Sequence, residues 1–310
     1  MPDSRSEASS AAARPDQFTL PDSLIAYLAG ERSPPLALMQ LLLHCGSVTA
    51  CEQLLEAAGA HGSSVQVVQR QGLEELRHLL ASRREQCLSL EPLLQAELPG
   101  DDGGQDSVSA WAQFFDAAVA QAAPASVALY SLGDPELLDA ATGEVLDYFT
   151  EQGLLGPRRR ILQIGCGIGR FEAVLAPLVA EAHGIDISPG MINAARQRCA
   201  GLANVHLACC SGRDLAPFAD FSLDMVYAVD SFPYLHESGG ALLETHFAES
   251  ARVLTRGGDL LILNFSYRND PEQDSREINR LATRHGFKVL VDGVQPFRLW
   301  DGRVWHLRLA

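Results

Sequence analysis

Residues 161–171 read ILQIGCGIGRF, a short apolar run that enters a G-x-G-x-G turn. The pattern EAVLAPLVAEA at 172–182 then predicts a helix. Glycines in such a turn allow a sharp reversal of the chain and let a ligand approach the backbone closely. The N-terminus of the following helix presents free N–H groups and the positive end of its dipole. Alone, the pattern predicts either a nucleotide site or simply a tight strand-to-helix turn.

The next apolar run, at 181–187, has a carboxylate, that of Asp186, as its next-to-last residue. Asp186 follows Gly169 by 17 residues, about where an acidic side chain at the end of a second strand accepts hydrogen bonds from ribose hydroxyls. An Asp here also suits a helix cap, although Ser188 and Pro189 would begin the helix equally well. Together, the turn and Asp186 favour binding of an adenosine group.

From Arg160 onward, short apolar runs alternate with helical segments, which is typical of a parallel sheet covered on both faces. No helix separates the last two runs, so we expect an antiparallel finish. We expect a hairpin turn at 301–302, flanked by Trp300 and Trp305, which either border a pocket or cover the sheet edge. The seven runs are RRILQIG at 159–165, EAHGIDI at 181–187, NVHLACC at 204–210, DMVYAV at 224–229, DLLILNF at 259–265, FKVLVDGV at 287–294 and RVWHLRL at 303–309.

The order of these elements resembles the class I S-adenosylmethionine-dependent methyltransferases. The glycine turn is similar to the first motif of that family, and GIDISPGMI at 184–192 is similar to its ribose-binding motif. SARVLTRGGDLLILNF at 250–265 resembles the helix, Gly-Gly turn and fifth strand that usually follow. The resemblance covers about half of the chain. It implies an α/β fold over residues 126–310: a Rossmann-like, doubly wound, seven-stranded sheet with an antiparallel last strand.

The resemblance also implies which residues bind S-adenosylmethionine. The glycine turn would pass the methionine group, Asp186 would hold the ribose, and Ile187 would pack on the adenine. Tyr130 either covers the methionine end or packs against the domain. Ser211 and Gly212 correspond to the adenine edge, and Asp230 to the bottom of the site. The expected cofactor-binding set is Tyr130, Gln163, Gly165, Cys166, Gly167, Gly169, Asp186, Ile187, Met191, Ser211, Gly212 and Asp230.

Two positions depart from the family pattern. Gln163 stands where the family usually has Asp or Glu, and Ser211 stands where it commonly has Asp. An amide oxygen or a hydroxyl can still accept a hydrogen bond, but neither carries charge. Weaker cofactor binding is therefore expected, rather than its loss.

Candidates for chemistry on the methyl acceptor follow the fourth predicted strand, at 229–237. Transfer from a sulfonium needs a base only where the acceptor must lose a proton. We expect His236 to be that base and Tyr234 to be a wall or hydrogen-bond donor, although a histidine here also often has a structural role. His206 is expected in the core. The stretch does not match the signature of amide or nucleobase N-methyltransferases. No metal site is expected.

The first half of the chain is expected to be a helical domain over residues 20–125, after a disordered tail at 1–19. Its helices are predicted at 34–45, 47–59, 64–87, a fourth before the break LPGDDGG at 98–104, and 107–120. The last 180 or so residues suffice for a minimal catalytic domain. We therefore expect these helices to form a lid or wall over the acceptor, and a homodimer contact is a further possibility.

Charge and composition restrict the partners. Residues 1–155 hold 22 acidic side chains against seven arginines, whereas residues 156–310 hold 17 of each sign. An acidic field repels phosphate backbones, so nucleic acid is not an expected partner. No apolar stretch has the roughly 20 residues that span a bilayer, and the seven cysteines are expected to be buried thiols. We expect a cytoplasmic protein without a membrane partner.

The sequence therefore predicts a methyltransferase that acts on a small-molecule acceptor at oxygen, nitrogen or carbon by in-line displacement. Two alternatives remain. One is a non-catalytic module that binds the cofactor or a basic protein. The other is a nicotinamide-dependent oxidoreductase, which is disfavoured because the RVLTRGG element at 252–258 has no role there.

Overall fold

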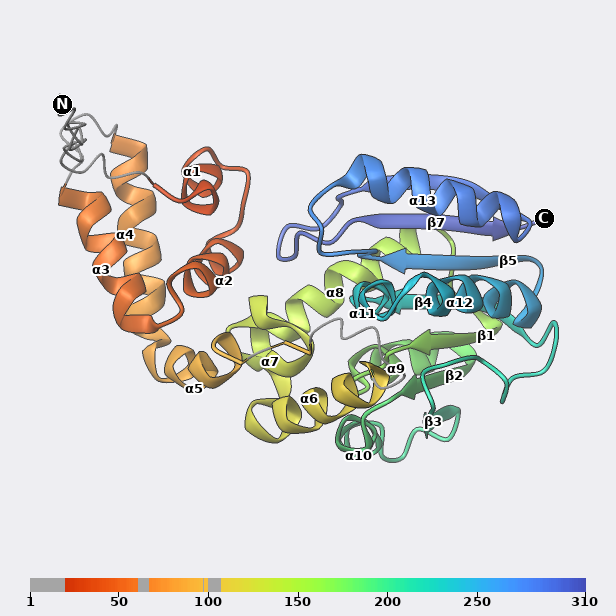
Figure 1. Cartoon of the computed structure of the whole chain (residues 1–310). Coiled ribbons are helices and arrows are strands. Elements are labelled where there is room, and N and C mark those ends of the chain that lie inside the picture. The colour runs from red at the N-terminus through yellow and green to blue at the C-terminus, as the bar shows by residue number, and fades with distance from the viewer. Residues whose placement is uncertain (1–19, 61–66, 97, 100–106) are drawn as a thin grey trace, which may run out of the picture.

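A computed structural model describes residues 20–60, 67–96, 98–99 and 107–310. The predicted tail at 1–19 and most of the predicted break at 98–104 lie outside these residues. The described chain forms two lobes, a smaller helical one and a larger one built around a sheet (Figure 1).

The larger lobe contains a seven-stranded sheet with the strand order β3-β2-β1-β4-β5-β7-β6. The strands from β1 to β5 pair in parallel, whereas β7 is antiparallel to both β5 and β6. This confirms the predicted doubly wound sheet with a reversed last strand. The strands are β1 (Gly156–Ile164), β2 (Val179–Asp186), β3 (Val205–Cys209), β4 (Leu223–Val229), β5 (Leu254–Leu263), β6 (Phe287–Val294) and β7 (Val304–Leu309).

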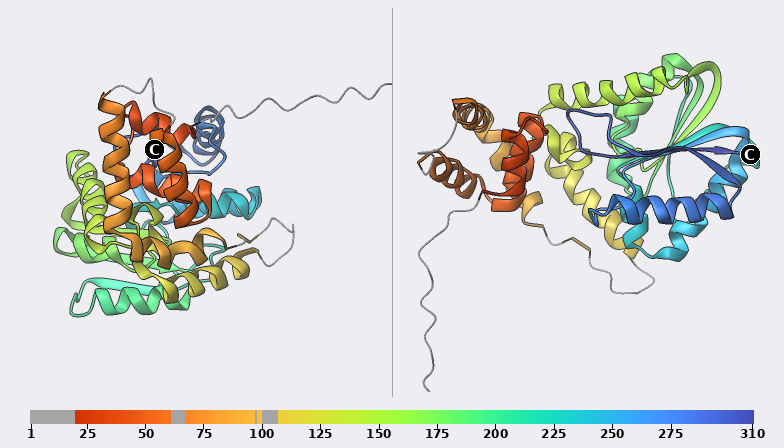
Figure 2. Two further views of the ribbon diagram at one scale, coloured as in Figure 1. Left: turned by 90° about the vertical axis from the view of Figure 1, so that its left-hand side faces the viewer. Right: turned by 90° about the horizontal axis from the view of Figure 1, so that it is seen from above.

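Helices cover both faces of the sheet (Figure 2). Neighbouring strand residues point to opposite faces, so Ile161 joins one apolar cluster and Leu162 the other. The first cluster packs under α8 (Pro135–Glu151), α9 (Arg170–Leu175) and α10 (Pro189–Arg198). The second packs under α11 (Phe232–Glu237), α12 (Gly240–Val253) and α13 (Pro271–Arg284).

Among the described residues the smaller lobe consists of five helices, and all of their buried apolar side chains except Leu90 belong to the same apolar cluster as the α8 face of the sheet. Pro34 begins one helix and Gly46, at φ 71°, ends it, as predicted. The helix predicted over 64–87 is instead two helices that meet at Arg83. The five are α1 (Asp22–Leu28), α2 (Pro34–Cys45), α3 (Val48–Ala60), α4 (Val67–Ser82) and α5 (Arg84–Leu94).

Two further helices, α6 (Ser107–Gln121) and α7 (Ala123–Val127), connect the lobes. One carboxylate docks α6 on the sheet lobe: Oδ1 of Asp116 accepts hydrogen bonds from Oγ of Ser188 at 2.5 Å and from the backbone N–H of Gly190 at 2.8 Å. The predicted domain boundary at residue 125 remains a prediction.

Some local predictions were wrong. The helix after the glycine turn ends at Leu175, before Pro177, and β2 already begins at Val179. Nine residues, 295–303, connect β6 to β7 in place of a hairpin turn at 301–302. His206 is exposed and stacks on His183, so it is not a core residue.

All seven cysteines are free, and Cys209 is exposed, contrary to the prediction of buried thiols. In the described part of the chain, no single helix is long and apolar enough to cross a membrane. The bent pair α2 and α3 passes that test only when the two are joined across a 110° break.

Candidate functional site

A cavity of about 630 Å³ opens at the carboxyl ends of the parallel strands and extends toward the helical lobe. Strand order reverses between β1 and β4, the place where doubly wound sheets bind ligands. The volume lies within the roughly 300–1,000 Å³ that is usual for small-molecule sites.

The glycine turn after β1 forms one edge of the cavity. Gly165 and Gly167 both line it and have φ values of 72° and 52°, which glycine adopts without strain. A Cβ at Gly165 would lie 2.5 Å from that of Ser231, so the turn also passes close to the end of β4. Gly169 faces away: a side chain there would meet Ala195 of α10.

Asp186 ends β2 and lines the same cavity. Its Oδ2 accepts a hydrogen bond from the backbone N–H of Gly167 at 2.8 Å, and its Oδ1 accepts one from that of Ser188 at 2.9 Å. The helix cap is Ser188, whose Oγ accepts from the N–H of Met191. A carboxylate has about four lone-pair positions. Asp186 therefore keeps capacity to accept hydrogen bonds from a ligand, and burial raises its pKa above the ordinary value.

The other predicted cofactor residues divide into two groups. Ile187, Met191 and Gly212 line the cavity, and a Cβ at Gly212 would lie 2.5 Å from Cγ2 of Ile187. Neither Cys166 nor Ser211 is among the lining residues, and Oγ of Ser211 accepts from the N–H of Arg213.

Gln163 is buried next to the cavity without lining it. Its Nε2 lies 3.5 Å from the carbonyl oxygen of Gly165. Its Oε1 is buried and has no hydrogen-bond partner among the described residues. Buried polar atoms are nearly always satisfied, so this free acceptor beside the glycine turn is consistent with a ligand donor or a water there.

Tyr130 belongs to a short 3₁₀ turn, η1 (Leu129–Ser131), and lines the cavity. Nη2 of Arg170 donates a 3.2 Å hydrogen bond to its hydroxyl oxygen. The Tyr130 ring lies 6.1 Å from that of Trp300, which is also a lining residue. The segment before α8 therefore does reach the cavity.

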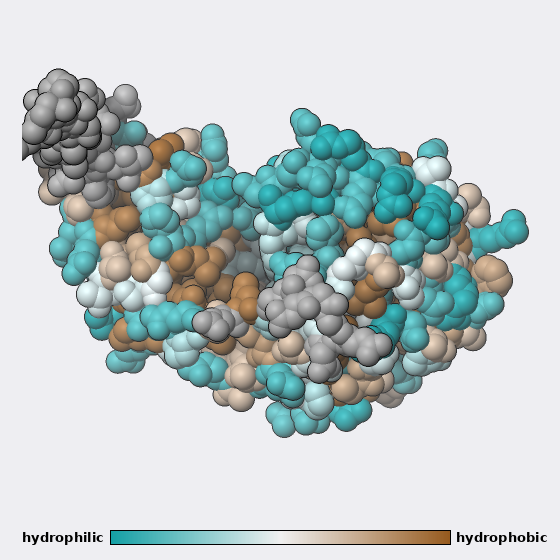
Figure 3. Space-filling model, in the orientation of Figure 1, coloured by the Kyte–Doolittle hydropathy of each residue, from teal (hydrophilic) through white to brown (hydrophobic). Residues whose placement is uncertain are grey.

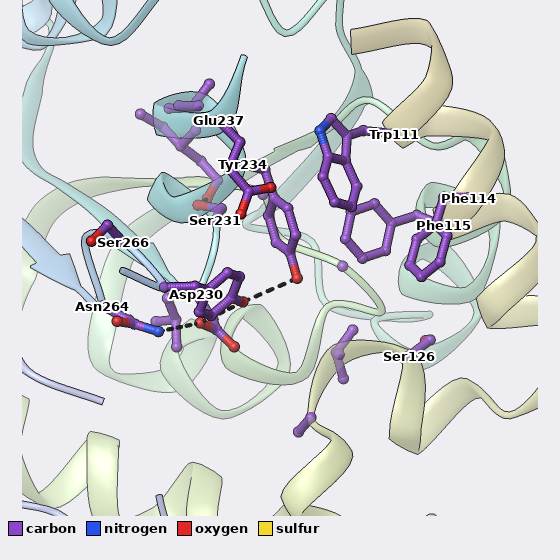
Figure 4. A pocket seen from close by; sticks show the side chains of 18 of the residues that line it. Trp111, Phe114, Phe115, Ser126, Asp230, Ser231, Tyr234, Glu237, Asn264 and Ser266 are labelled. Atoms are coloured by element: carbon purple, nitrogen blue, oxygen red, sulfur yellow. Dashed lines mark hydrogen bonds between the residues drawn. The ribbon is translucent and has the colours of Figure 1, made fainter. Parts of the chain in front are cut away.

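Asp230 follows β4 directly and occupies a left-handed backbone conformation, at φ 59°. Such a conformation is strained for a residue other than glycine and is concentrated at functional sites. Its Oδ1 accepts hydrogen bonds from Nδ2 of Asn264 at 2.7 Å and from the hydroxyl of Tyr267 at 3.0 Å (Figure 4). Its Oδ2 has no donor among the described residues. Burial raises the pKa of this carboxyl.

The two predicted catalytic residues lie in different places. Tyr234 lines the cavity, with its hydroxyl 3.0 Å from that of Tyr267. His236 is not among the lining residues: its Nε2 lies 3.1 Å from Nη1 of Arg268 and 3.5 Å from Oε2 of Glu277. The structure therefore does not bring the predicted base to the cavity.

Among the described residues that line the cavity, the one histidine is His246 of α12, which sequence reasoning missed. Burial lowers its pKa, and its Nδ1 lies 2.9 Å from the carbonyl oxygen of Leu242. Asn264 and Tyr267 were also missed, whereas Glu237, a further lining residue, lies in the predicted candidate stretch at 229–237. Asn264 alone had a signal, because it is a polar residue near the carboxyl end of the fifth predicted strand, at 259–265.

Comparisons with known proteins agree with this fold. A family of methyltransferase domains matches residues 162–262. A demethylmenaquinone methyltransferase of Tropheryma whipplei is 36% identical over 107 residues, which are 34% of this chain and 42% of that protein. Phosphoethanolamine N-methyltransferase 1 of Arabidopsis thaliana is 30% identical over 151 residues, 47% of this chain and 28% of that protein. The chain thus spans less than half the length of either relative.

Among solved structures, the magnesium protoporphyrin IX methyltransferase of Synechocystis PCC 6803 aligns with a TM-score of 0.51 at 18% identity. The alignment covers 67% of this chain and all of that one, and at this identity it concerns the fold. The matched profile begins inside β1 and ends inside β5, so it includes the glycine turn, Asp186 and Asp230. Residues 162–262 therefore match a methyltransferase domain, and the chain has the fold of the Synechocystis enzyme over the aligned residues.

Proposed function

We propose that this protein transfers the methyl group of S-adenosylmethionine to a small-molecule acceptor bound in the cavity between its two lobes. One observation carries the proposal: Gly165, Gly167, Asp186 and Asp230 lie around a single cavity at the switch point of the sheet. Two curated relatives named for methylation of small molecules, a demethylmenaquinone and a phosphoethanolamine, support it.

The residues present suit the cofactor. Asp186 would hold the ribose hydroxyls with the acceptor capacity that its two backbone hydrogen bonds leave free. Gly165 and Gly167 would let the methionine group lie against the backbone, and Ile187 with Gly212 would border the adenine. Oε1 of Gln163 is a free acceptor for a donor beside the turn. When bound, S-adenosylmethionine supplies a methyl group on a sulfonium sulfur that leaves readily as a thioether.

The residues of the chain would then contribute orientation, exclusion of water and proton transfer. The aromatic side chains of α6 and Tyr234 would cover the acceptor and keep water out. We propose Asp230, rather than His236, as the proton acceptor for an acceptor that must be deprotonated. Its Oδ1 is fixed by Asn264 and Tyr267, which leaves Oδ2 available, and its raised pKa makes it a stronger base than an exposed Asp. Tyr234 would orient the acceptor through its hydroxyl.

Calorimetric titration of the full chain with S-adenosylmethionine, S-adenosylhomocysteine and NADH tests the cofactor. We expect micromolar binding of both sulfur compounds, no binding of NADH, and loss of binding in Asp186→Ala. Asp220→Ala, at an exposed residue outside the cavity, is the matched control and should bind normally. Binding of NADH in place of the sulfur compounds would refute the proposal. Binding without turnover of any acceptor would indicate the non-catalytic module.

A further inference from the structure

Aromatic side chains line much of the cavity. Three belong to α6: Trp111 and Phe115 lie against Tyr234 of α11, and Phe114 packs on both of them (Figure 4). The ring centroid of Tyr234 is 4.6 Å from that of Trp111 and 5.0 Å from that of Phe115. We call these four residues the aromatic wall. Flat rings of a ligand pack well on such a surface, because aromatic pairs are favourable at centroid distances of 4.5–7 Å.

A second aromatic surface borders the same cavity. Tyr130 and Trp300 line it, and Phe297 stacks behind Trp300 with centroids 5.4 Å apart. Because Phe297 stacks on it, the Trp300 ring is held in place, so this second surface is preformed. Preformed surfaces bind rigid ligands with little loss of side-chain entropy.

The cavity is also apolar where it meets the helical lobe. Met39 and Leu43 of α2 and Leu93 and Leu94 of α5 line it there, together with Leu98. Leu43 and Leu98 are 46% and 62% exposed, so the cavity is open to solvent at these large apolar side chains. Figure 3 shows apolar residues gathered in the hollow between the lobes. Exposed apolar surface in a concave place is characteristic of a binding site for an apolar ligand.

Charge in the lining is mostly negative, with seven carboxylates against one arginine among the described lining residues. Among the described lining residues the only arginine or lysine is Arg303, and its Nη1 donates to the carbonyl oxygen of Gly293. Two of the carboxylates, Asp274 and Asp301, face Arg268 and Arg32. An acceptor with a carboxylate or phosphate would find repulsion here and few partners. The seven lining carboxylates are those of Asp186, Asp214, Asp230, Glu237, Asp270, Asp274 and Asp301.

We propose that the methyl acceptor is a compound with fused aromatic rings and without negative charge, and this inference rests on the proposed function. Its rings lie against the aromatic wall, its polar group faces Asp230, and any apolar extension points toward Leu43 and Leu94. Acceptors that bear carboxylate or phosphate groups are excluded by the acidic lining.

Three probes of ten or eleven carbons test this inference by calorimetry on the full chain saturated with S-adenosylhomocysteine. They are 2-naphthol, 6-hydroxy-2-naphthoate, which adds one carboxylate, and 1-decanol, which has no ring. We expect 2-naphthol to bind at least tenfold more tightly than either of the others. If 6-hydroxy-2-naphthoate bound as tightly as 2-naphthol, the inference that the site rejects negative charge would be wrong. If 1-decanol bound as tightly as 2-naphthol, the inference that the site selects aromatic rings would be wrong.

Variants locate the binding. Trp111→Ala should weaken 2-naphthol binding at least fivefold while leaving the affinity for S-adenosylhomocysteine within twofold. Phe221→Ala is the matched control, because Phe221 is exposed and lies outside the cavity, and it should change neither affinity. Glu237→Gln removes one negative charge from the lining, so it should reduce the difference in affinity between 2-naphthol and 6-hydroxy-2-naphthoate.

The two proposals fail in different ways. If the unaltered protein did not bind S-adenosylhomocysteine, the proposed function would be refuted. Two outcomes would refute only the acceptor class. In the first, the protein binds S-adenosylhomocysteine but not 2-naphthol. In the second, Trp111→Ala binds 2-naphthol as tightly as the unaltered protein does.

Discussion

Nε2 of Gln40, in α2 of the helical lobe, donates a 2.8 Å hydrogen bond to Oδ2 of Asp301, in the connection between β6 and β7. Arg32 contacts the same oxygen at 3.5 Å. On its other side, this connection is held by Glu144 of α8, which accepts from the backbone N–H groups of Arg298 and Leu299. Asp301 lines the cavity. The helical lobe is therefore bonded directly to a segment that borders the site.

The first prediction concerns this contact. Gln40→Ala leaves one oxygen of Asp301 with only the longer Arg32 contact and should loosen the connection that carries Trp300. We expect 2-naphthol binding to weaken three- to tenfold and S-adenosylhomocysteine binding to stay within twofold. Hydrogen bonds to charged groups contribute about 1.5–3 kcal/mol to stability, so the melting temperature should also fall. Gln53→Ala, at an exposed position of α3, is the control. Unchanged 2-naphthol affinity in Gln40→Ala would show that the contact does not shape the site.

The second prediction concerns the proposed base. Asp230→Asn keeps the size of the side chain and an oxygen for Asn264 and Tyr267, but it cannot take a proton. With an acceptor that must be deprotonated, we expect turnover to fall about 10²–10⁴-fold, the usual contribution of a general base. Affinity for S-adenosylhomocysteine should change less than threefold.

The pH profile provides an independent test of Asp230. Because burial raises its pKa above the ordinary value, turnover in the unaltered enzyme should rise with pH as the carboxyl loses its proton. That rise should be absent in Asp230→Asn. If turnover of Asp230→Asn rose with pH in the same way as turnover of the unaltered enzyme, the titrating group would be one other than Asp230.

The third prediction is that His236 is not the general base. Its imidazole contacts Arg268, which is itself bonded to Asp274 and Glu277, so it belongs to a network with α13. His236→Ala should leave turnover within threefold and lower the stability modestly. A hundredfold loss of turnover in a variant that still binds S-adenosylhomocysteine and melts normally would restore His236 as the base.

The sequence predicted best what local patterns determine. Each apolar run formed a strand at the expected place, and the buried strands β4 and β5 have the continuous apolar residues that buried parallel strands need. Gly165, Gly167 and Asp186 came together because strand ends meet at one edge of the sheet. The direction of each side chain within the short helix α11 was harder to predict from the sequence. Phe232 and Pro233 are buried and set the rotation of α11, which turns Tyr234 and Glu237, three residues apart, to the cavity.

The walls of the cavity could not be predicted. Trp111 and Phe115 were visible as helix residues, but their place in the site depends on α6 docking through Asp116, a contact between residues 72 and 74 positions apart. Likewise, no pattern marked His246 rather than His236, because the packing of α12 decides which histidine faces the cavity.

The last prediction concerns Glu172, which is fully buried beneath the glycine turn with neither carboxyl oxygen hydrogen-bonded within the described chain. Burial raises its pKa from 4.5 to about 8. The folded protein thus keeps this proton up to about pH 8, whereas the unfolded chain releases it near 4.5. The destabilising effect of Glu172 is therefore absent below about pH 4.5, grows as pH rises, and is complete above 8. Each unit of pKa shift corresponds to about 1.4 kcal/mol.

Glu172→Gln removes this ionisation and keeps the shape of the side chain. We expect the variant to unfold at a higher denaturant concentration than the unaltered protein, with a larger difference at pH 9 than at pH 5. Glu151→Gln, at the exposed end of α8, should show no such trend. Urea titrations at pH 5, 7 and 9 measure the effect. A difference that stays constant across these three values would mean that Glu172 does not hold its proton in the folded state.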